Sequence, residues 1–171
     1  HMFIVNALDK LHKQINIFNF DTFVIPESRS TMNAEIVRFI GNMIPKHRFN
    51  KITLLKNAPA NISFNWEKWE AYIEMCQNNG TPKFVNDAAK RQAIKSIETL
   101  MDKIHKADYF SIAETVKKNQ YKTFINDYLI CPGKCINDVK TAKGIMIIDD
   151  VTTTGATIME ALKAIRSVNP D

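Results

Sequence analysis

One segment constrains this chain more than any other: a short apolar run that ends in two adjacent acids and leads into a helix. Residues 145–148 are apolar without alternation, which is typical of a strand buried on both faces. Asp149 and Asp150 follow, and then a turn of three threonines and Gly155. From Thr157 to Val168 apolar residues recur at helical spacing. The segment therefore predicts a strand, a polar turn and an amphipathic helix in direct succession.

This order of elements favours a site for a phosphate and its sugar. Backbone N–H groups and the positive end of a helix dipole attract phosphate at the start of a helix. Gly155 lets the backbone approach a ligand closely, and threonine hydroxyls add donors. The two acids would repel a bare phosphate, but they suit ribose hydroxyls or an intervening Mg²⁺. Ordinary helix capping is the alternative, and a P-loop is excluded because its glycine–lysine pattern is absent.

The rest of the chain predicts an α/β fold with a parallel sheet, since apolar runs alternate with helical patterns. The other strands are expected at Thr22–Pro26, Lys51–Leu55 and Phe124–Cys131. Helices are expected at Phe3–Phe18, at Asn33–Met43 with Asn33 as the N-cap, and over about residues 65–119 with a break at 78–82. The chain stops just after a helix that should lead into another strand, so we expect a truncated C-terminus.

The segment Ile145–Thr157 resembles the phosphoribosyl pyrophosphate (PRPP) motif of type I phosphoribosyltransferases. The resemblance implies the Rossmann-like fold of that family. It also implies that Asp149 and Asp150 are the catalytic acids that hold the ribose. The 5-phosphate would be cradled by Thr152, Thr153, Thr154, Gly155, Ala156 and Thr157.

Earlier parts of the chain resemble the same family in the same order. Its first core strand precedes a pyrophosphate-binding loop, which Glu27–Thr31 matches, and a later strand ends in a basic residue. The resemblance implies that pyrophosphate is bound by Ser28, Arg29, Ser30 and Lys56. Arg29–Glu35 is also similar to the Arg-Gly-Phe-Asn-Gln-Ala segment of the ComF-like competence subgroup. For Arg29 and Lys56, ordinary surface charge is the alternative.

These likenesses imply one phosphoribosyltransferase domain over residues 3–171, with a helical insertion over about residues 60–120. The expected activity moves a 5-phosphoribosyl group from PRPP to a nitrogen base and releases pyrophosphate, with Mg²⁺ bound through the substrate. The alternative is a non-catalytic PRPP or nucleotide sensor, or a DNA-uptake accessory. The family's hypoxanthine–guanine enzymes carry an aspartate at the position of Thr153, and its absence argues against an enzyme of that kind. The base and the oligomeric state stay open.

Composition adds weaker constraints. A net charge of +5 favours anionic partners, and no apolar run is long enough to cross a membrane, so we expect a cytoplasmic protein. Cys76, Cys131 and Cys135 are an odd number of thiols, which indicates reduced cysteines rather than a disulfide framework, with a metal site as the lesser alternative.

Two helical patterns have a structural and a functional interpretation. Lys and Arg residues lie opposite the apolar face of about residues 85–106, which predicts a solvated face, with nucleic-acid contact as the alternative. Trp66, Trp69, Tyr72 and Ile73 predict core packing, with a hood over a base as the alternative.

Overall fold

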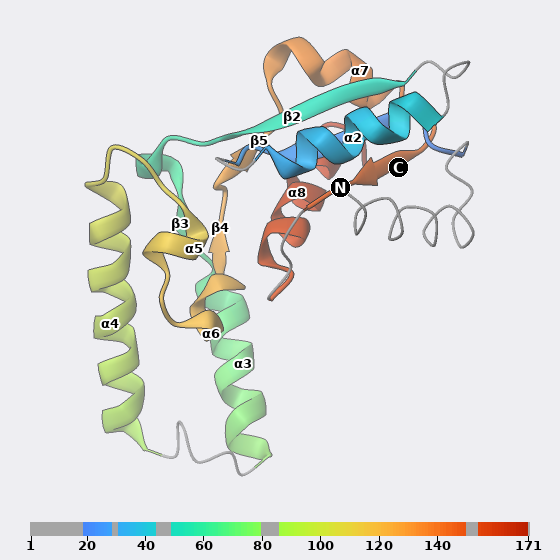
Figure 1. Cartoon of the computed structure of the whole chain (residues 1–171). Coiled ribbons are helices and arrows are strands. Elements are labelled where there is room, and N and C mark those ends of the chain that lie inside the picture. Colours follow the sequence, from blue (N-terminus) through green and yellow to red (C-terminus); the bar gives the residue numbers. More distant parts are fainter. Residues whose placement is uncertain (1–18, 29–30, 44–48, 80–85, 150–153, 171) are drawn as a thin grey trace. The chain divides into compact units, whose positions relative to one another are not determined.

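The computed structural model describes residues 19–28, 31–43, 49–79, 86–149 and 154–170 (Figure 1). The predicted helix Phe3–Phe18 lies outside this part of the chain. The described residues form two compact units. The first contains residues up to Leu55 together with 129–149 and 157–170, and the second contains 56–128 together with 154–156.

The first unit is built on a four-stranded sheet with the order β5-β2-β1-β6. Its strands are β1 (Thr22–Pro26), β2 (Asn50–Lys56), β5 (Leu129–Ile130) and β6 (Ile145–Ile147). β1 pairs in parallel with both β2 and β6. The predicted strand Thr22–Pro26 is confirmed, and all five of its residues are buried. The protein is therefore a mixed α/β protein with a mostly parallel central sheet.

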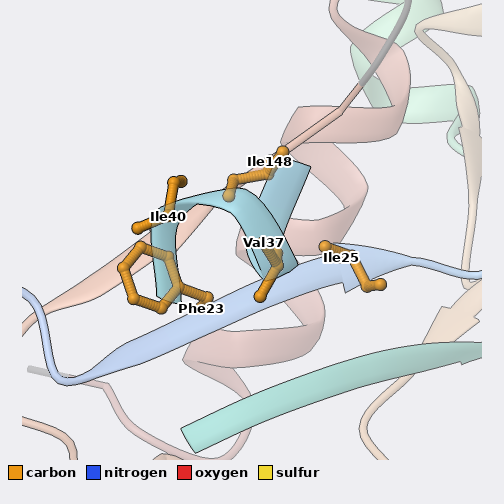
Figure 2. Packing of buried hydrophobic residues seen from close by; sticks show 5 residues of the cluster. All are labelled: Phe23, Ile25, Val37, Ile40 and Ile148. Carbon is orange, nitrogen blue, oxygen red and sulfur yellow. The ribbon is translucent and has the colours of Figure 1, made fainter. Parts of the chain in front are cut away.

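Helix α2 (Met32–Met43) packs its apolar stripe on this sheet. Val37 and Ile40 of α2 form one buried cluster with Phe23 and Ile25 of β1 and with Ile148, which follows β6 (Figure 2). Phe23 and Ile25 are alternate residues of a strand, so they lie on the same face of the sheet. The positions 37 and 40 repeat at helical spacing, so α2 presents them together.

The other helices of this unit flank β6. The short α7 (Ile136–Lys140), which the sequence pattern did not predict, follows a single 3-10 turn and precedes β6. Helix α8 (Ala156–Arg166) follows β6 and agrees with the predicted helix to within two residues at each end.

Three predictions for this unit are wrong in detail. β6 is not buried on both faces: its three residues are each only half-buried, because β6 is an edge strand of the sheet. The second strand is not buried throughout: Ile52 and Leu54 are buried whereas Lys51 and Leu55 are exposed, which is the alternation of a strand with one covered face. Asn33 is not the N-cap of α2, because the helix begins at Met32. The carbonyl of Thr31 already accepts the N–H of Glu35 at 3.0 Å, which places the cap at Thr31.

The second unit is mainly helical. Its long helices are α3 (Trp66–Asn78) and α4 (Asp87–His105), and each is capped by an asparagine side chain, Asn65 and Asn86 respectively. The shorter elements are η2 (Pro59–Asn61), β3 (Ser63–Phe64), α5 (Ile112–Thr115), α6 (Asn119–Lys122) and β4 (Ile125–Asn126). The predicted insertion over about residues 60–120 falls within this unit.

The predicted strand Phe124–Cys131 is interrupted. β4 pairs antiparallel with β3 in the second unit, whereas β5 belongs to the sheet of the first unit. Between them Asp127 adopts a φ of 65°, a left-handed conformation that cannot continue a strand. The apolar run therefore spans the boundary between the two units. Within the described residues, no helix is long and apolar enough to cross a bilayer.

Candidate functional site

The candidate site begins where β1 and β6 end side by side. Val24 is in register with Ile147, and the N–H of Ile148 donates to the carbonyl of Val24 at 2.9 Å. Continuing this parallel register by two residues brings Asp149 level with Pro26. We call residues 26–28 and 148–149 the carboxyl edge of these two strands.

The strand order marks this edge as the expected place for a ligand. Of the strands in the described residues, β1 comes first, and it lies between β2, which follows through α2, and β6, which comes last. The chain passes from β1 through α2 to β2 on one side of β1, whereas β6 pairs with the other side of β1. In open α/β sheets, ligands bind outside the carboxyl ends of the strands at such a reversal.

Asp149 is the first of the two predicted sugar-binding acids. It follows the last ladder residue of β6 and is half-buried, so its carboxylate is not sealed inside the core. Asp150 lies outside the described residues, as do Thr152 and Thr153.

The turn into α8 has the conformation that its glycine makes accessible. Gly155 has a φ of 71°, and among the described atoms nothing would lie within 4 Å of a Cβ added there. The space beside Gly155 is therefore open, as a backbone that approaches a ligand requires. Ala156 is buried and starts the helix, and Thr157 is half-buried in its first turn.

Thr154 also has a plain capping role. Its hydroxyl accepts the N–H of Ala156 at 3.4 Å, so one donor at the start of α8 already has a partner. Thr154 therefore fits both the capping interpretation and the phosphate interpretation, because both use the unpaired N–H groups of a helix start.

The predicted pyrophosphate residues are only partly described. Ser28 is exposed immediately after β1, whereas Arg29 and Ser30 lie outside the described residues. Lys56 ends β2, and its ammonium group hydrogen-bonds to the hydroxyl of Tyr109 and lies 4.0 Å from the centroid of that ring. Lys56 would have to leave Tyr109 to reach a pyrophosphate, so its role stays a prediction.

Asn33 is the polar residue that our sequence reasoning misplaced. It is 2% exposed in the first turn of α2, and neither its amide nitrogen nor its amide oxygen has a hydrogen-bond partner among the described residues. The signal was present in the sequence: Asn33, Val37 and Ile40 share a helical stripe whose other members are apolar.

The cysteines and acids of the described residues offer no ready metal centre. No group of three or more His, Cys, Asp or Glu side chains in that part of the chain could hold a metal ion. Burial raises the pKa of the Cys131 thiol, and the neighbouring Cys135 raises it further. A raised pKa favours the protonated thiol, whereas zinc binds the thiolate.

The structure of the second unit distinguishes between the two interpretations of each helical pattern, the aromatic residues of α3 and the charged face of α4. Trp69 and Ile73 are each 1% exposed, so core packing is confirmed for both, while Trp66 keeps 38% of its surface exposed and stacks edge-on against Trp69. The exposed positions of α4 carry acids, such as Glu98 and Asp102, among their basic residues. This mixture of signs suits a solvated face better than a track for a nucleic-acid backbone.

Comparisons with protein-family models, with curated proteins and with solved structures give no match for this chain.

Proposed function

We propose that this protein binds PRPP at the carboxyl edge of β1 and β6 and transfers its 5-phosphoribosyl group to a nitrogen base. The observation that carries the proposal is the position of Asp149. This half-buried acid lies two residues after the end of β6, beside β1 at the reversal of the strand order, and the chain then enters α8 through Gly155 at a left-handed φ.

The chemistry needs little beyond positioning. The bond between the anomeric carbon and the pyrophosphate oxygen breaks, and a bond from that carbon to a nitrogen of the base forms. Charge develops on the departing pyrophosphate and on an oxocarbenium-like ribose. A carboxylate that accepts the ribose hydroxyls fixes the sugar for the displacement, and this is the role we assign to Asp149 and Asp150.

The phosphate ends of the ligand need donors and positive charge. The start of α8, with Thr154 to Thr157, would bind the 5-phosphate through backbone N–H groups and hydroxyls. The start of α2 and Ser28 would face the pyrophosphate, together with Arg29, Ser30 and Lys56. Mg²⁺ would be bound through the substrate, because the oxygens of the pyrophosphate suit this hard cation.

Calorimetric titration of the full chain with PRPP and Mg²⁺ tests the proposal. We expect Asp149→Asn to weaken binding by about ten- to a hundredfold, the value of one hydrogen bond to a charged group. Asp138→Asn is the matched control, because Asp138 is an exposed carboxylate on α7 of the same unit. If Asp149→Asn binds PRPP as tightly as the wild type, the assignment of the sugar site is wrong.

Turnover separates the enzyme from the sensor that remains the alternative. An enzyme releases pyrophosphate from PRPP in the presence of at least one purine, pyrimidine or related acceptor. Binding of PRPP without release with any acceptor in such a panel would favour the non-catalytic sensor, since the same fold and site serve both.

A further inference from the structure

Asn33 breaks the packing rule that the rest of its helix obeys. Buried polar atoms are nearly always hydrogen-bonded, and a buried amide without partners destabilises the fold that contains it. Asn33 is 2% exposed, and both polar atoms of its side chain lack a partner among the described residues. A leucine has the same branching and the same number of side-chain heavy atoms, although it is larger, and it would leave no polar atom unpaired at this position of an apolar stripe.

The position of Asn33 on α2 places it on the side of the helix that faces the sheet. Val37 and Ile40, one and two turns along α2, pack on Phe23, Ile25 and Ile148 (Figure 2). Asn33 precedes Val37 by four residues on the same stripe, so it faces the sheet as they do. β1 is joined to the start of α2 by a short connection, so the first turn of the helix lies at the strand's carboxyl end.

A second feature at the same place attracts anions. Helix α2 has twelve residues, and the N–H groups of its first turn carry the positive end of the helix dipole. A helix start alone would not indicate a ligand. A buried amide with both a donor and an acceptor unused, on the inner side of that first turn, does.

We propose that Asn33 is a ligand-binding residue that contacts the diphosphate and the sugar of the bound substrate at once. Its amide nitrogen donates to a diphosphate oxygen, and its amide oxygen accepts from a ribose hydroxyl. The ligand class is a sugar diphosphate, because a diphosphate alone offers no donor and a sugar alone offers no anion for the helix start. This assignment rests on the proposed function and gives Asn33 a role that the resemblance did not assign to it.

The test compares stability and affinity in the same variants of the full chain. Asn33→Leu should raise the Tm of the ligand-free protein, because it removes two unpaired buried polar atoms. The same change should weaken binding of Mg²⁺–PRPP and of Mg²⁺–pyrophosphate by about ten- to a hundredfold. Ribose 5-phosphate, which lacks the diphosphate, should lose less affinity than PRPP.

Asn169→Leu is the matched control. Asn169 is a half-buried residue of the same unit, but its amide nitrogen donates to the carbonyl of Val139 at 2.8 Å. Its replacement should lower the Tm and leave the affinity for PRPP unchanged. The opposite signs of the two Tm changes would distinguish an unused amide from one that stabilises the fold.

Either of two results would overturn the inference while the proposed function stands. One is an Asn33→Leu protein whose Tm does not exceed that of the wild type, because the amide then stabilises the ligand-free fold. The other is an Asn33→Leu protein that binds PRPP as tightly as the wild type. If the wild type binds none of the three probes, the proposed function fails, and this inference fails with it.

Discussion

Replacing Gly155, in the turn before α8, tests how much the backbone conformation of this turn contributes to stability, without a steric clash from the new side chain. It is the one glycine of the described chain with a positive φ, 71°, and no described atom lies within 4 Å of the position of an added Cβ. Replacement by alanine should therefore lower the free energy of unfolding only through the strain of the left-handed conformation, by about 1–2 kcal/mol. Alanine also restricts the unfolded chain, which offsets about 0.4–1 kcal/mol of that cost.

Gly133 is the control that isolates this conformational cost. It likewise has no atom within 4 Å of an added Cβ, but its φ is not in the left-handed region. Gly133→Ala should therefore keep the gain from the unfolded state and raise stability by about 0.4–1 kcal/mol. The two variants should differ by about 1–2 kcal/mol, which is about 2–8 °C in Tm for a chain of this size.

Asparagine at position 155 separates the fold from the ligand. Asn tolerates the left-handed region better than alanine does, so Gly155→Asn should lie between Gly155→Ala and the wild type in Tm. Both variants place a side chain where the proposed 5-phosphate would meet the backbone, so both should weaken PRPP binding in calorimetry. Thermal unfolding that finds Gly155→Ala as stable as Gly133→Ala would refute the conformational argument.

Two further predictions concern the connection that leads into β6. Gly144→Ala should lower the Tm, since its Cβ would lie 2.2 Å from the backbone oxygen of Asn19; overpacking of this kind costs about 1–3 kcal/mol, and an unchanged Tm would contradict the clash. The carboxylate of Asp21 is partly desolvated, which alone would raise its pKa, but backbone N–H groups of Lys143 and Gly144 and the hydroxyl of Thr22 bring the pKa below 3.8. Because the folded-state pKa is depressed, this stabilisation is present above pH 3.8 and is lost as the pH falls through the lower folded value. The difference in urea midpoint between wild type and Asp21→Asn should therefore be larger at pH 6 than below pH 3.8, and an equal difference at both would contradict it.

Residues that pack in a single unit were predictable from the sequence. β1 appears at its predicted bounds because a run buried on both faces contains no polar interruption. Helix α8 was recognisable from its apolar spacing, and β6 from its unbroken apolar run. In β1 and α8 local preference and burial favour the same element. The apolar run of β6 predicted the strand but not its burial, because its three residues are only half-buried at the edge of the sheet.

The predictions failed where burial depends on long-range contacts. Phe124–Cys131 is apolar except for its middle, and its first half pairs with β3 and its second half with β2, with the chain changing partner at Asp127. The side chain of Asp127 accepts the hydroxyl of Ser63 at 2.5 Å, a contact across 64 residues that no local pattern contains. The adjacent Asn126 and Asp127, both of which favour turns, are the local signal for two strands that the prediction of one strand overlooked.

Asn33 is a second residue at which a local sequence rule gave the wrong prediction. Asparagine next to the start of a helical pattern is a good N-cap by local rules, and the sequence supports that interpretation. In the structure Thr31 precedes the first helical residue, so Asn33 becomes an interior residue of the buried stripe. A shift of two residues thus converts a satisfied cap into a buried amide without a described partner. Local rules that fail at one buried polar residue, while they hold for the rest of the helix, indicate selection for something other than stability. At the carboxyl edge of β1, that requirement is best met by a ligand.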